Sequence, residues 1–299
     1  MRLPTTLSVI LPVLIFTAAI LGAILKGNAA YDAFKRLLDR LKLLRCRKLY
    51  GNHRDFALVY SELFLSYRIV PEELRRRPFV KPHITDTFSL HRMACVCEIR
   101  AASYITGSLT NLGRRVLNPE SDVEWKGSAT QSAILLGTTS NRWSMQLLDL
   151  AGWIRYDKIR RRFVSRRSGR CLHDLHSQSV DYGAIVRIFP RPDEKVMWTM
   201  CGGTREHGTS GCAWYLSHRL DELCQEIRQK NQPFVCIVIV KQENDTLAKA
   251  IFLAQTEADL ESHAISDCPG TDDISSCPHD CKQRIDELYS ATEKKAKAP

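Results

Sequence analysis

A glycine-rich loop between an apolar run and a helical pattern is the segment of this chain best suited to chemistry. The run Val196–Met200 leads into Gly202, Gly203, Gly208 and Gly211, and a helix-like pattern follows. The N-terminus of a helix offers unpaired N–H groups and the positive end of the helix dipole, which favour an anion. The segment therefore predicts a ligand that carries phosphate or carboxylate, without specifying which.

The glycine spacing also allows two familiar motifs to be tested. Gly203-x4-Gly208-Thr209-Ser210 has the spacing of a Walker A loop, but Thr209 stands where that loop requires its phosphate-binding lysine. A conventional P-loop NTPase is disfavoured, and the dinucleotide pattern G-x-G-x-x-G is absent. A structural interpretation stays open beside the anion site, because glycines also permit tight turns and close helix packing.

A second polar loop, Gly137–Asn141, follows the short apolar strand predicted at residues 132–136 and precedes a predicted helix. Ligands of open α/β sheets bind beyond the C-terminal ends of the strands, so we expect this loop and residues 202–211 to converge. A helix cap formed by Ser140 or Asn141 is the alternative. The predicted ligand-binding residues are Gly137, Thr138, Ser140, Asn141, Gly202, Gly203, Thr204, Gly208 and Thr209.

Catalytic candidates are few. Glu206 and His207, inside the glycine loop, offer a carboxylate and a titratable imidazole for acid–base chemistry, although a solvated pair is the alternative. There is no nucleophile-elbow motif. A cysteine–histidine cluster at residues 268–281 lacks the usual C-x2-C spacing, so no metal site and no specific cofactor are predicted.

The first 26 residues predict a membrane anchor. No charged side chain occurs from Leu3 to Leu25, a stretch long enough to span a bilayer, although a cleaved signal peptide stays open. Basic residues crowd the C-terminal flank, whereas Arg2 stands alone before the stretch. The positive-inside rule then predicts a single-pass protein of the inner (cytoplasmic) membrane with its C-terminal domain in the cytoplasm. Reduced thiols among the eleven cysteines fit that compartment.

The net charge of +10 fits the same prediction. Basic residues of the amphipathic juxtamembrane segment, Lys26–Lys48, predict contact with anionic membrane lipid. Nucleic acid is a less natural partner, and the sequence does not indicate an oligomeric state. A second basic segment, Lys158–Arg170, is expected to form a hairpin. It is either solvated, turned toward lipid headgroups or, less naturally, bound to nucleic acid.

The remaining pattern predicts an α/β fold, a Rossmann-like sheet flanked by helices. Residues 27–82 are expected to form basic juxtamembrane helices and a linker, with helices on both sides of Gly51-Asn52. Residues 83–256 form the α/β domain, opening with a helix at 86–109. Residues 257–299 form an acidic linker and a C-terminal helix. Within the α/β domain, strands are predicted at 132–136, 183–189, 196–200, 234–240 and 250–254, with helices at 142–150 and 212–230.

Three of these segments resemble an uncharacterised bacterial domain family. They are LLGTTSN at 135–141, DYGAIVRI at 181–188 and MCGGTREHGTSGCAWYL at 200–216. That family carries a G-S-P-x-S-N-like loop and a later G-x-x-x-x-G-T segment, which Ser140-Asn141 and Gly208-Thr209 match. The resemblance covers His83–Thr256. It implies a Rossmann-like core similar to the nucleotide-sensing and Toll/interleukin-receptor-like domains of bacterial signalling proteins.

The leading functional hypothesis is a membrane-anchored cytosolic domain that binds a nucleotide or another anion in a sensing or signalling role. Two alternatives stay open. One is a hydrolase that cleaves a nucleoside or dinucleotide bond with Glu206 as acid or base, and the other is a ligand-free scaffold for other proteins.

Overall fold

The computed structural model describes residues 47–50, 53–66, 80–83, 87–90, 94–127, 130–173, 180–191, 196–241 and 244–265. The chain divides into two compact units, Met1–Lys48 and Leu49–Pro299, and the sheets and helices below belong to the second. The predicted anchor at 1–26, the cysteine–histidine cluster at 268–281 and the predicted C-terminal helix lie outside the described residues. In the part that is described, no helix has the length and apolar character needed to cross a membrane.

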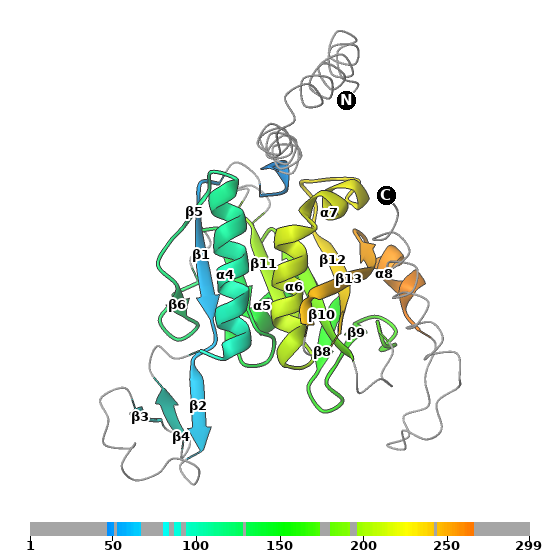
Figure 1. Cartoon of the computed structure of the whole chain (residues 1–299). Coiled ribbons are helices and arrows are strands. Elements are labelled where there is room, and N and C mark those ends of the chain that lie inside the picture. Colours follow the sequence, from blue (N-terminus) through cyan, green and yellow to red (C-terminus); the bar gives the residue numbers. More distant parts are fainter. Residues whose placement is uncertain are drawn as a thin grey trace, which may run out of the picture. The chain divides into compact units, whose positions relative to one another are not determined.

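A large mixed sheet forms the centre of the second unit (Figure 1). Eight of the described strands belong to it, in the order β13-β12-β10-β11-β7-β1-β5, with β6 also paired to β1. The pairs β11–β7, β7–β1 and β1–β5 are parallel. The pairs β11–β10, β10–β12 and β12–β13 are antiparallel. The strands are β1 (Asp55–Tyr60), β5 (Arg115–Val116), β6 (Glu120–Ser121), β7 (Ala133–Leu136), β10 (Val180–Ile188), β11 (Trp198–Gly203), β12 (Phe234–Lys241) and β13 (Asn244–Ala254).

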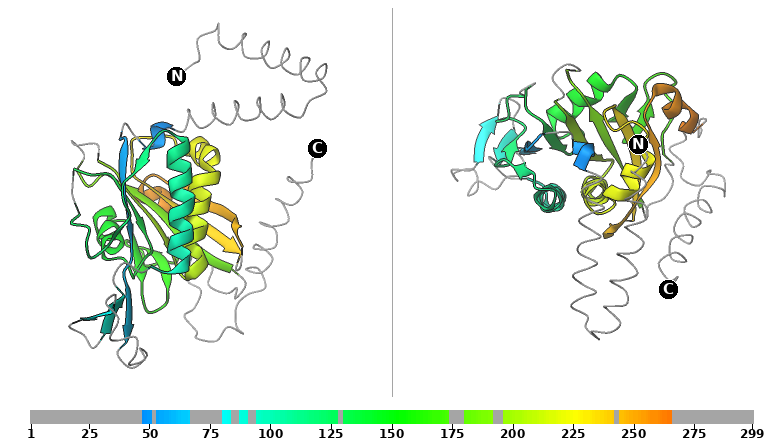
Figure 2. Two further views of the ribbon diagram at one scale, coloured as in Figure 1. Left: turned by 60° about the vertical axis from the view of Figure 1, so that its left-hand side comes forward. Right: turned by 90° about the horizontal axis from the view of Figure 1, so that it is seen from above.

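Helices cover both faces of this sheet (Figure 2). Two long helices, α4 (Val96–Asn111) and α6 (Glu206–His218), pack side by side on one face, and a short helix, α7 (Leu220–Glu226), continues from α6. The opposite face carries α5 (Arg142–Ala151) and α8 (Glu257–His263). The structure therefore confirms a mixed α/β fold with a large sheet flanked by helices.

Two smaller sheets complete the described strands. One contains β2 (Leu63–Ser66), β3 (Val80–His83) and β4 (Thr87–Leu90) in the order β2-β4-β3. The other is the hairpin of β8 (Ile154–Asp157) and β9 (Arg162–Ser165). The hairpin predicted at Lys158–Arg170 is thus present but begins earlier, and the predicted segment contains its turn and its second strand.

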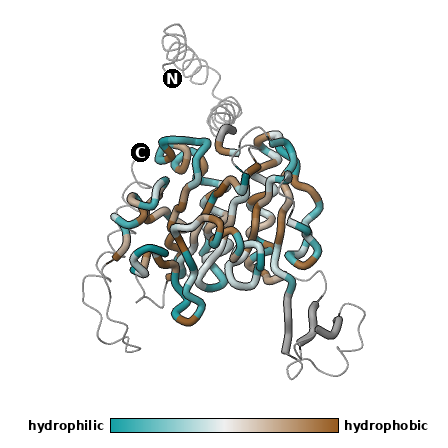
Figure 3. Tube along the Cα trace, turned by 180° about the vertical axis from the view of Figure 1, so that it is seen from behind, coloured by the Kyte–Doolittle hydropathy of each residue, from teal (hydrophilic) through white to brown (hydrophobic). Residues whose placement is uncertain are grey.

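The sheet is buried because its central strands are apolar on both faces. All nine residues of β10 and all four of β7 are buried, and the hydrophobic stretches in Figure 3 run along the central strands. Alternate residues point to opposite faces, so Ala184 and Val186 join the core beneath α5, whereas Gly183 faces α6. A strand covered on both faces reads as a continuous apolar run rather than as an alternation.

Most predicted elements are confirmed, but three helices differ from the prediction. The helix predicted at 212–230 is two helices, α6 and α7, and it begins at Glu206, inside the predicted glycine loop. The helix predicted after Gly51-Asn52 is wrong, because residues 53–66 form β1 and β2, and β1 lies within the large sheet. A short apolar run has no periodicity that separates a buried strand from a buried helix. The helix predicted at 86–109 begins only at Val96, because residues 87–90 form β4.

The compact unit includes segments that the sequence assigned to linkers. It begins at Leu49, before the start predicted at residue 83. Residues 257–263, within the predicted acidic linker, form α8, and the side chain of Leu260 is buried in the core.

The connections of β7 and β11 determine where a ligand could bind. These neighbouring parallel strands end at the same edge of the sheet. The chain leaves β7 for α5 on one face and β11 for α6 on the other. In open α/β sheets such a point of divergence leaves a crevice beyond the strand ends, where ligands bind.

Candidate functional site

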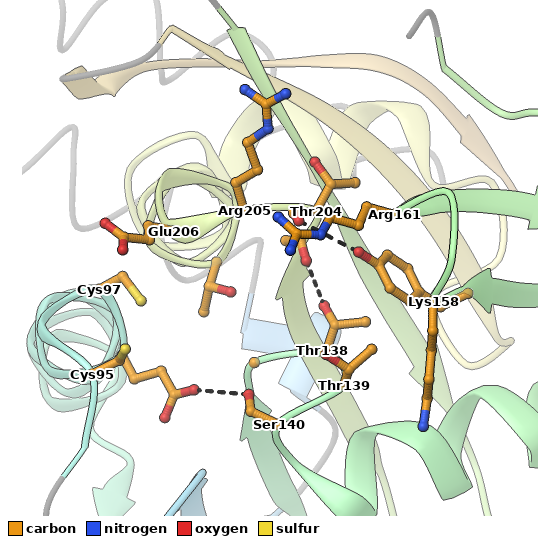
Figure 4. Close-up of a pocket in the computed structure, with 15 residues that line it drawn as sticks. Cys95, Cys97, Thr138, Thr139, Ser140, Lys158, Arg161, Thr204, Arg205 and Glu206 are labelled. Atoms are coloured by element: carbon orange, nitrogen blue, oxygen red, sulfur yellow. Dashed lines mark hydrogen bonds between the residues drawn. The ribbon is translucent and has the colours of Figure 1, made fainter. Parts of the chain in front are cut away.

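A pocket of about 420 Å³ lies at this edge of the sheet (Figure 4). The β7–α5 and β11–α6 loops, the start of α4 and the β8–β9 hairpin line it. Its volume falls within the range of small-molecule sites. The structure thus brings together the two loops that the sequence predicted to converge. The lining residues are Cys95, Cys97, Glu98, Gly137, Thr138, Thr139, Ser140, Tyr156, Lys158, Arg161, Gly203, Thr204, Arg205, Glu206 and Thr209.

The β7–α5 loop joins the β11–α6 loop directly. The hydroxyl of Thr138 donates a hydrogen bond to the carbonyl oxygen of Gly203 at 2.9 Å. A Cβ on Gly202 would collide with this same hydroxyl. Thr138 is buried by the contact, whereas Ser140, two residues on, is exposed. The side chain of Ser140 is therefore accessible from the pocket.

Asn141 has a structural role. Its side chain is fully buried and accepts hydrogen bonds from the backbone N–H groups of Trp143 and Ser144. Its amide nitrogen donates to the carbonyl oxygens of Val59 and Leu136. These four bonds cap α5 and fix its start against β1 and β7. Asn141 does not line the pocket, so the cap interpretation holds for this residue.

The glycines on either side of the β11–α6 loop, Gly203 at the end of β11 and Gly208 and Gly211 within α6, serve close packing. A Cβ on Gly203 would lie 2.6 Å from the Cα of Gly208, and a Cβ on Gly208 would collide with the carbonyl oxygen of Tyr182. A Cβ on Gly211 would collide with the side chain of Val240. The glycines let α6 lie directly on β10, β11 and β12. Of the predicted ligand-binding glycines, Gly137 and Gly203 line the pocket, whereas Gly202 and Gly208 do not.

The carboxylate of Asp181 occupies the N-terminal end of α6. It accepts hydrogen bonds from the backbone N–H of Gly208 at 2.6 Å, of Tyr182 at 2.7 Å and of Arg205 at 3.0 Å. The hydroxyl of Thr204 donates to it as well, at 2.6 Å. Burial raises the pKa of Asp181, and these four donors oppose that shift. The anion that the sequence predicted at this helix end is thus a side chain of the protein itself.

Glu98 is the least expected member of the pocket. It sits in the first turn of α4 and is only 4% exposed. Its carboxylate accepts hydrogen bonds from the backbone N–H of Ser61 at 2.8 Å and from the hydroxyl of Ser61 at 2.6 Å. Burial, with a smaller contribution from nearby Asp122, raises the pKa of Glu98 to about 7, although the hydrogen bonds from Ser61 and Ser140 oppose the shift. Both charge states of this carboxyl are therefore populated near neutral pH.

Three cations line another part of the pocket. Lys158 and Arg161 belong to the β8–β9 turn and Arg205 to the β11–α6 loop, and all three are exposed. Among the described residues, no carboxylate lies within ion-pair distance of any of them. Figure 4 shows Lys158 and Arg161 across the pocket from Cys95 and Cys97. Lys158, Arg161 and Arg205 therefore give the pocket a cationic wall, in addition to its thiols and its buried carboxyl group.

Arg161 holds an unusual backbone conformation. Its φ of +50° lies in the left-handed region, which residues with a side chain seldom occupy. Such strain costs about 1 kcal/mol or more, and it concentrates at functional sites. A glycine would relieve the strain but would remove the guanidinium group from the pocket wall.

Neutral donors complete the lining. The hydroxyl of Tyr156 donates to the carbonyl oxygen of Thr204 at 3.4 Å, and burial raises its pKa to about 12. Burial likewise raises the pKa of Cys97 to about 12, so both groups stay protonated at neutral pH. Thr209 is buried in the first turns of α6 and contributes its hydroxyl-bearing side chain to the lining.

The two predicted catalytic residues lie in different surroundings. Glu206 lines the pocket from an exposed position at its rim. His207 does not line it, because its ring nitrogen Nδ1 contacts the carboxylate of Asp245 on β13 at 3.2 Å. Arg100 of α4 pairs with the same carboxylate at 3.2 Å. His207 thus belongs to a cluster that ties α6 to α4 and β13.

Sequence reasoning missed Glu98, Ser61 and Arg205, and it used the basic hairpin only as a surface feature. No motif marks Glu98, since it lies within an otherwise ordinary helical segment. Asp181 had one available signal, a carboxylate next to the apolar run at 182–188, but its partner Gly208 is distant in sequence.

No protein family, curated protein or solved structure matches this chain. The resemblance to a Rossmann-like bacterial domain family therefore stays a prediction.

Proposed function

We propose that this pocket binds a small phosphate-bearing anion, of the nucleotide class, in a Rossmann-like domain. The observation that carries the proposal is the cationic wall of Lys158, Arg161 and Arg205, which has no carboxylate partner among the described residues. Arginine forks and lysine ammonium groups are the side chains that proteins most often place against phosphate. Their position at the divergence of β7 and β11 is where α/β sheets bind ligands.

The phosphate is proposed to contact these side chains rather than the helix ends. Asp181 already fills the N-terminus of α6, and Asn141 caps α5. At α5 a second anion would meet N–H groups that Asn141 already occupies, and at α6 it would meet the charge of Asp181. The cationic wall, by contrast, carries charge that the ligand can neutralise.

The rest of the ligand would face hydrogen-bonding groups. Thr209, Ser140 and Glu98 line the pocket, and they suit the hydroxyl and amine groups of a sugar or base. A sensing or signalling role follows if the predicted membrane anchor tethers this domain. In that role, ligand binding would be the signal that the domain detects.

Thermal unfolding of the full chain in non-ionic detergent tests this proposal. Inorganic phosphate, nucleoside mono- and triphosphates and nicotinamide dinucleotides would be added one at a time. A ligand at a hundred times its Kd adds about 2.7 kcal/mol of stability and raises Tm by several degrees. The shift should disappear in Arg161→Ala and persist in Arg167→Ala, an exposed residue outside the pocket. No shift with any anion would favour the ligand-free scaffold.

A further inference from the structure

Two serine hydroxyls and one carboxyl group form a chain at the end of the pocket where α4 meets the β7–α5 loop. The hydroxyl oxygens of Ser140 and Ser61 lie 2.8 Å apart. The hydroxyl of Ser61 donates to the carboxylate of Glu98 at 2.6 Å, and Ser140 itself lies 3.5 Å from the same carboxylate oxygen. Because Ser61 gives its one proton to Glu98, its oxygen is left to accept the proton of Ser140. This series of hydrogen bonds thus runs from the exposed hydroxyl of Ser140 to the buried carboxylate of Glu98.

Gly137 makes this cluster possible. Its φ of +89° is a conformation that favours glycine. A Cβ at this position would lie 2.6 Å from the carboxylate of Glu98, 2.9 Å from the hydroxyl of Ser61 and 3.0 Å from that of Ser140. All three groups converge on the space that a side chain here would fill. The left-handed conformation of Gly137 and its lack of a side chain therefore both allow Glu98, Ser61 and Ser140 to come into contact.

The arrangement matches what an activated nucleophile requires. Nucleophilic catalysis needs an accessible hydroxyl, a base within hydrogen-bond reach and a third group that orients the base. Ser140 is exposed and lines the pocket. Ser61 orients Glu98 twice, through its backbone N–H and through its hydroxyl. We propose that Ser140 is a nucleophile, with Glu98 as its general base through Ser61, and that the pocket hydrolyses phosphoesters.

The substrate class rests on the proposed function, in which Lys158, Arg161 and Arg205 hold the phosphate. Cationic side chains stabilise the charge that develops on a phosphoryl group during transfer. Burial raises the pKa of Glu98 to about 7, close to the value at which a residue serves best as a base at neutral pH. Glu206, the other carboxylate that lines the pocket, is less suited to act as the base because it is exposed at the rim.

The reaction would proceed in two displacements at phosphorus. The Ser140 oxygen bonds to phosphorus as the leaving alkoxide departs with the electron pair of its bond to phosphorus and takes a proton from solvent. The proton of Ser140 passes to Ser61, and the proton of Ser61 passes to the carboxylate of Glu98. Water then attacks phosphorus and releases one proton to solvent. The bond from phosphorus to the Ser140 oxygen breaks, and Ser140 regains its proton from Glu98 through Ser61.

The test uses bis(p-nitrophenyl) phosphate and the full chain in non-ionic detergent. Its leaving group, p-nitrophenolate, needs no proton from the protein and is followed by its absorbance. Wild type should release p-nitrophenolate with a rate that rises as pH passes through about 7, where Glu98 loses its proton. Ser140→Ala should abolish release, and Glu98→Gln should lower it by about 10²–10⁴-fold and remove the pH dependence. Ser262→Ala and Glu257→Gln, exposed positions on α8 outside the pocket, should match wild type.

Folding and phosphate binding are measured beside turnover. Ser140→Ala should keep the thermal transition of wild type, Glu98→Gln should still unfold in one cooperative transition, and both should keep the Tm shift that inorganic phosphate produces. Phosphate binding without p-nitrophenolate release would overturn the nucleophile and leave the proposed function standing. Release that survives Ser140→Ala would overturn it as well. Absence of both release and phosphate binding would overturn both proposals.

Discussion

The carboxylate of Asp181 accepts a hydrogen bond from the backbone N–H of Gly208 at 2.6 Å, across the point where β10 passes the start of α6. A glycine-rich strand–loop–helix segment usually suggests a ligand at the helix end. Here the protein supplies that anion, and the glycines allow α6 to approach β10 closely enough for the contact. The side chains that remain open to a ligand lie beside the helix end, in the cationic wall.

Asp181→Asn should destabilise the fold. The amide keeps the size of the side chain, but its NH2 group faces N–H and O–H donors that need an acceptor. The expected loss is about 1–3 kcal/mol of unfolding free energy, the cost of leaving a buried donor unsatisfied. Urea denaturation would measure it, with Asp149→Asn, an exposed surface ion pair, as the control. Equal stability of the two variants would contradict the role given to Asp181.

Gly208→Ala and Gly107→Ala form a matched pair of helical substitutions. A Cβ on Gly208 would meet the backbone of Tyr182 and lie 2.6 Å from the Cα of Gly203, whereas a Cβ on Gly107 meets nothing within 4 Å. Gly208→Ala should lower the free energy of unfolding by about 1–3 kcal/mol. Gly107→Ala should raise it by about 0.5–1 kcal/mol, because alanine favours a helix. Denaturant titrations of both variants check the prediction, and a harmless Gly208→Ala would refute the packing role.

Glu98 should make the protein less stable as pH rises. Burial raises its pKa in the folded state to about 7 from an ordinary 4.5, so the folded protein holds this proton more tightly than the unfolded chain. The contribution is fully present below pH 4.5 and is lost as pH passes through about 7, a change of about 3 kcal/mol. Wild type and Glu98→Gln would be unfolded in urea at pH 5 and pH 8. The variant should lose less stability between the two, and equal losses would refute the shifted pKa.

Arg187 should contribute strongly to stability although it takes no part in the pocket. It is 1% exposed, and its guanidinium donates to the carbonyl oxygens of Leu49, Lys230 and Gln232, each at 2.8 Å. Arg187→Met would leave three carbonyl groups without their donor, at a cost of about 3 kcal/mol or more. Thermal or urea unfolding would show this loss. Arg167→Met, at an exposed position, should unfold like wild type.

The sequence predicted the parts of the site that depend on neighbouring residues. A strand, a polar loop and a helix follow one another at 132–151 and again at 198–218, so the convergence of Gly137 and Gly203 was within reach of pattern reasoning. The pairing of β7 with β11 is what joins them. The same local reasoning failed at β1, where a buried apolar run has no distinguishing period.

The contacts that give the pocket its chemistry join residues far apart in sequence. Ser61 meets Glu98 across 37 positions and Asp181 meets Gly208 across 27. Neither carboxylate was among the predicted site residues, and each takes its character from burial that only the packed sheet and helices provide. A single sequence contains no record of such burial. The cations at 158 and 161 were visible as a basic segment, but not as a wall of the pocket.

Isothermal titration of AMP and of inorganic phosphate into the full chain tests the central claim most directly, because it measures occupancy of the pocket without requiring a reaction. Wild type and Arg167→Ala should bind with the same affinity, whereas Arg161→Ala should bind about tenfold more weakly or worse, as expected for loss of a charge-assisted contact. Binding that is unchanged in Arg161→Ala, or no binding of either anion to wild type, would contradict the proposal that this pocket is a phosphate site.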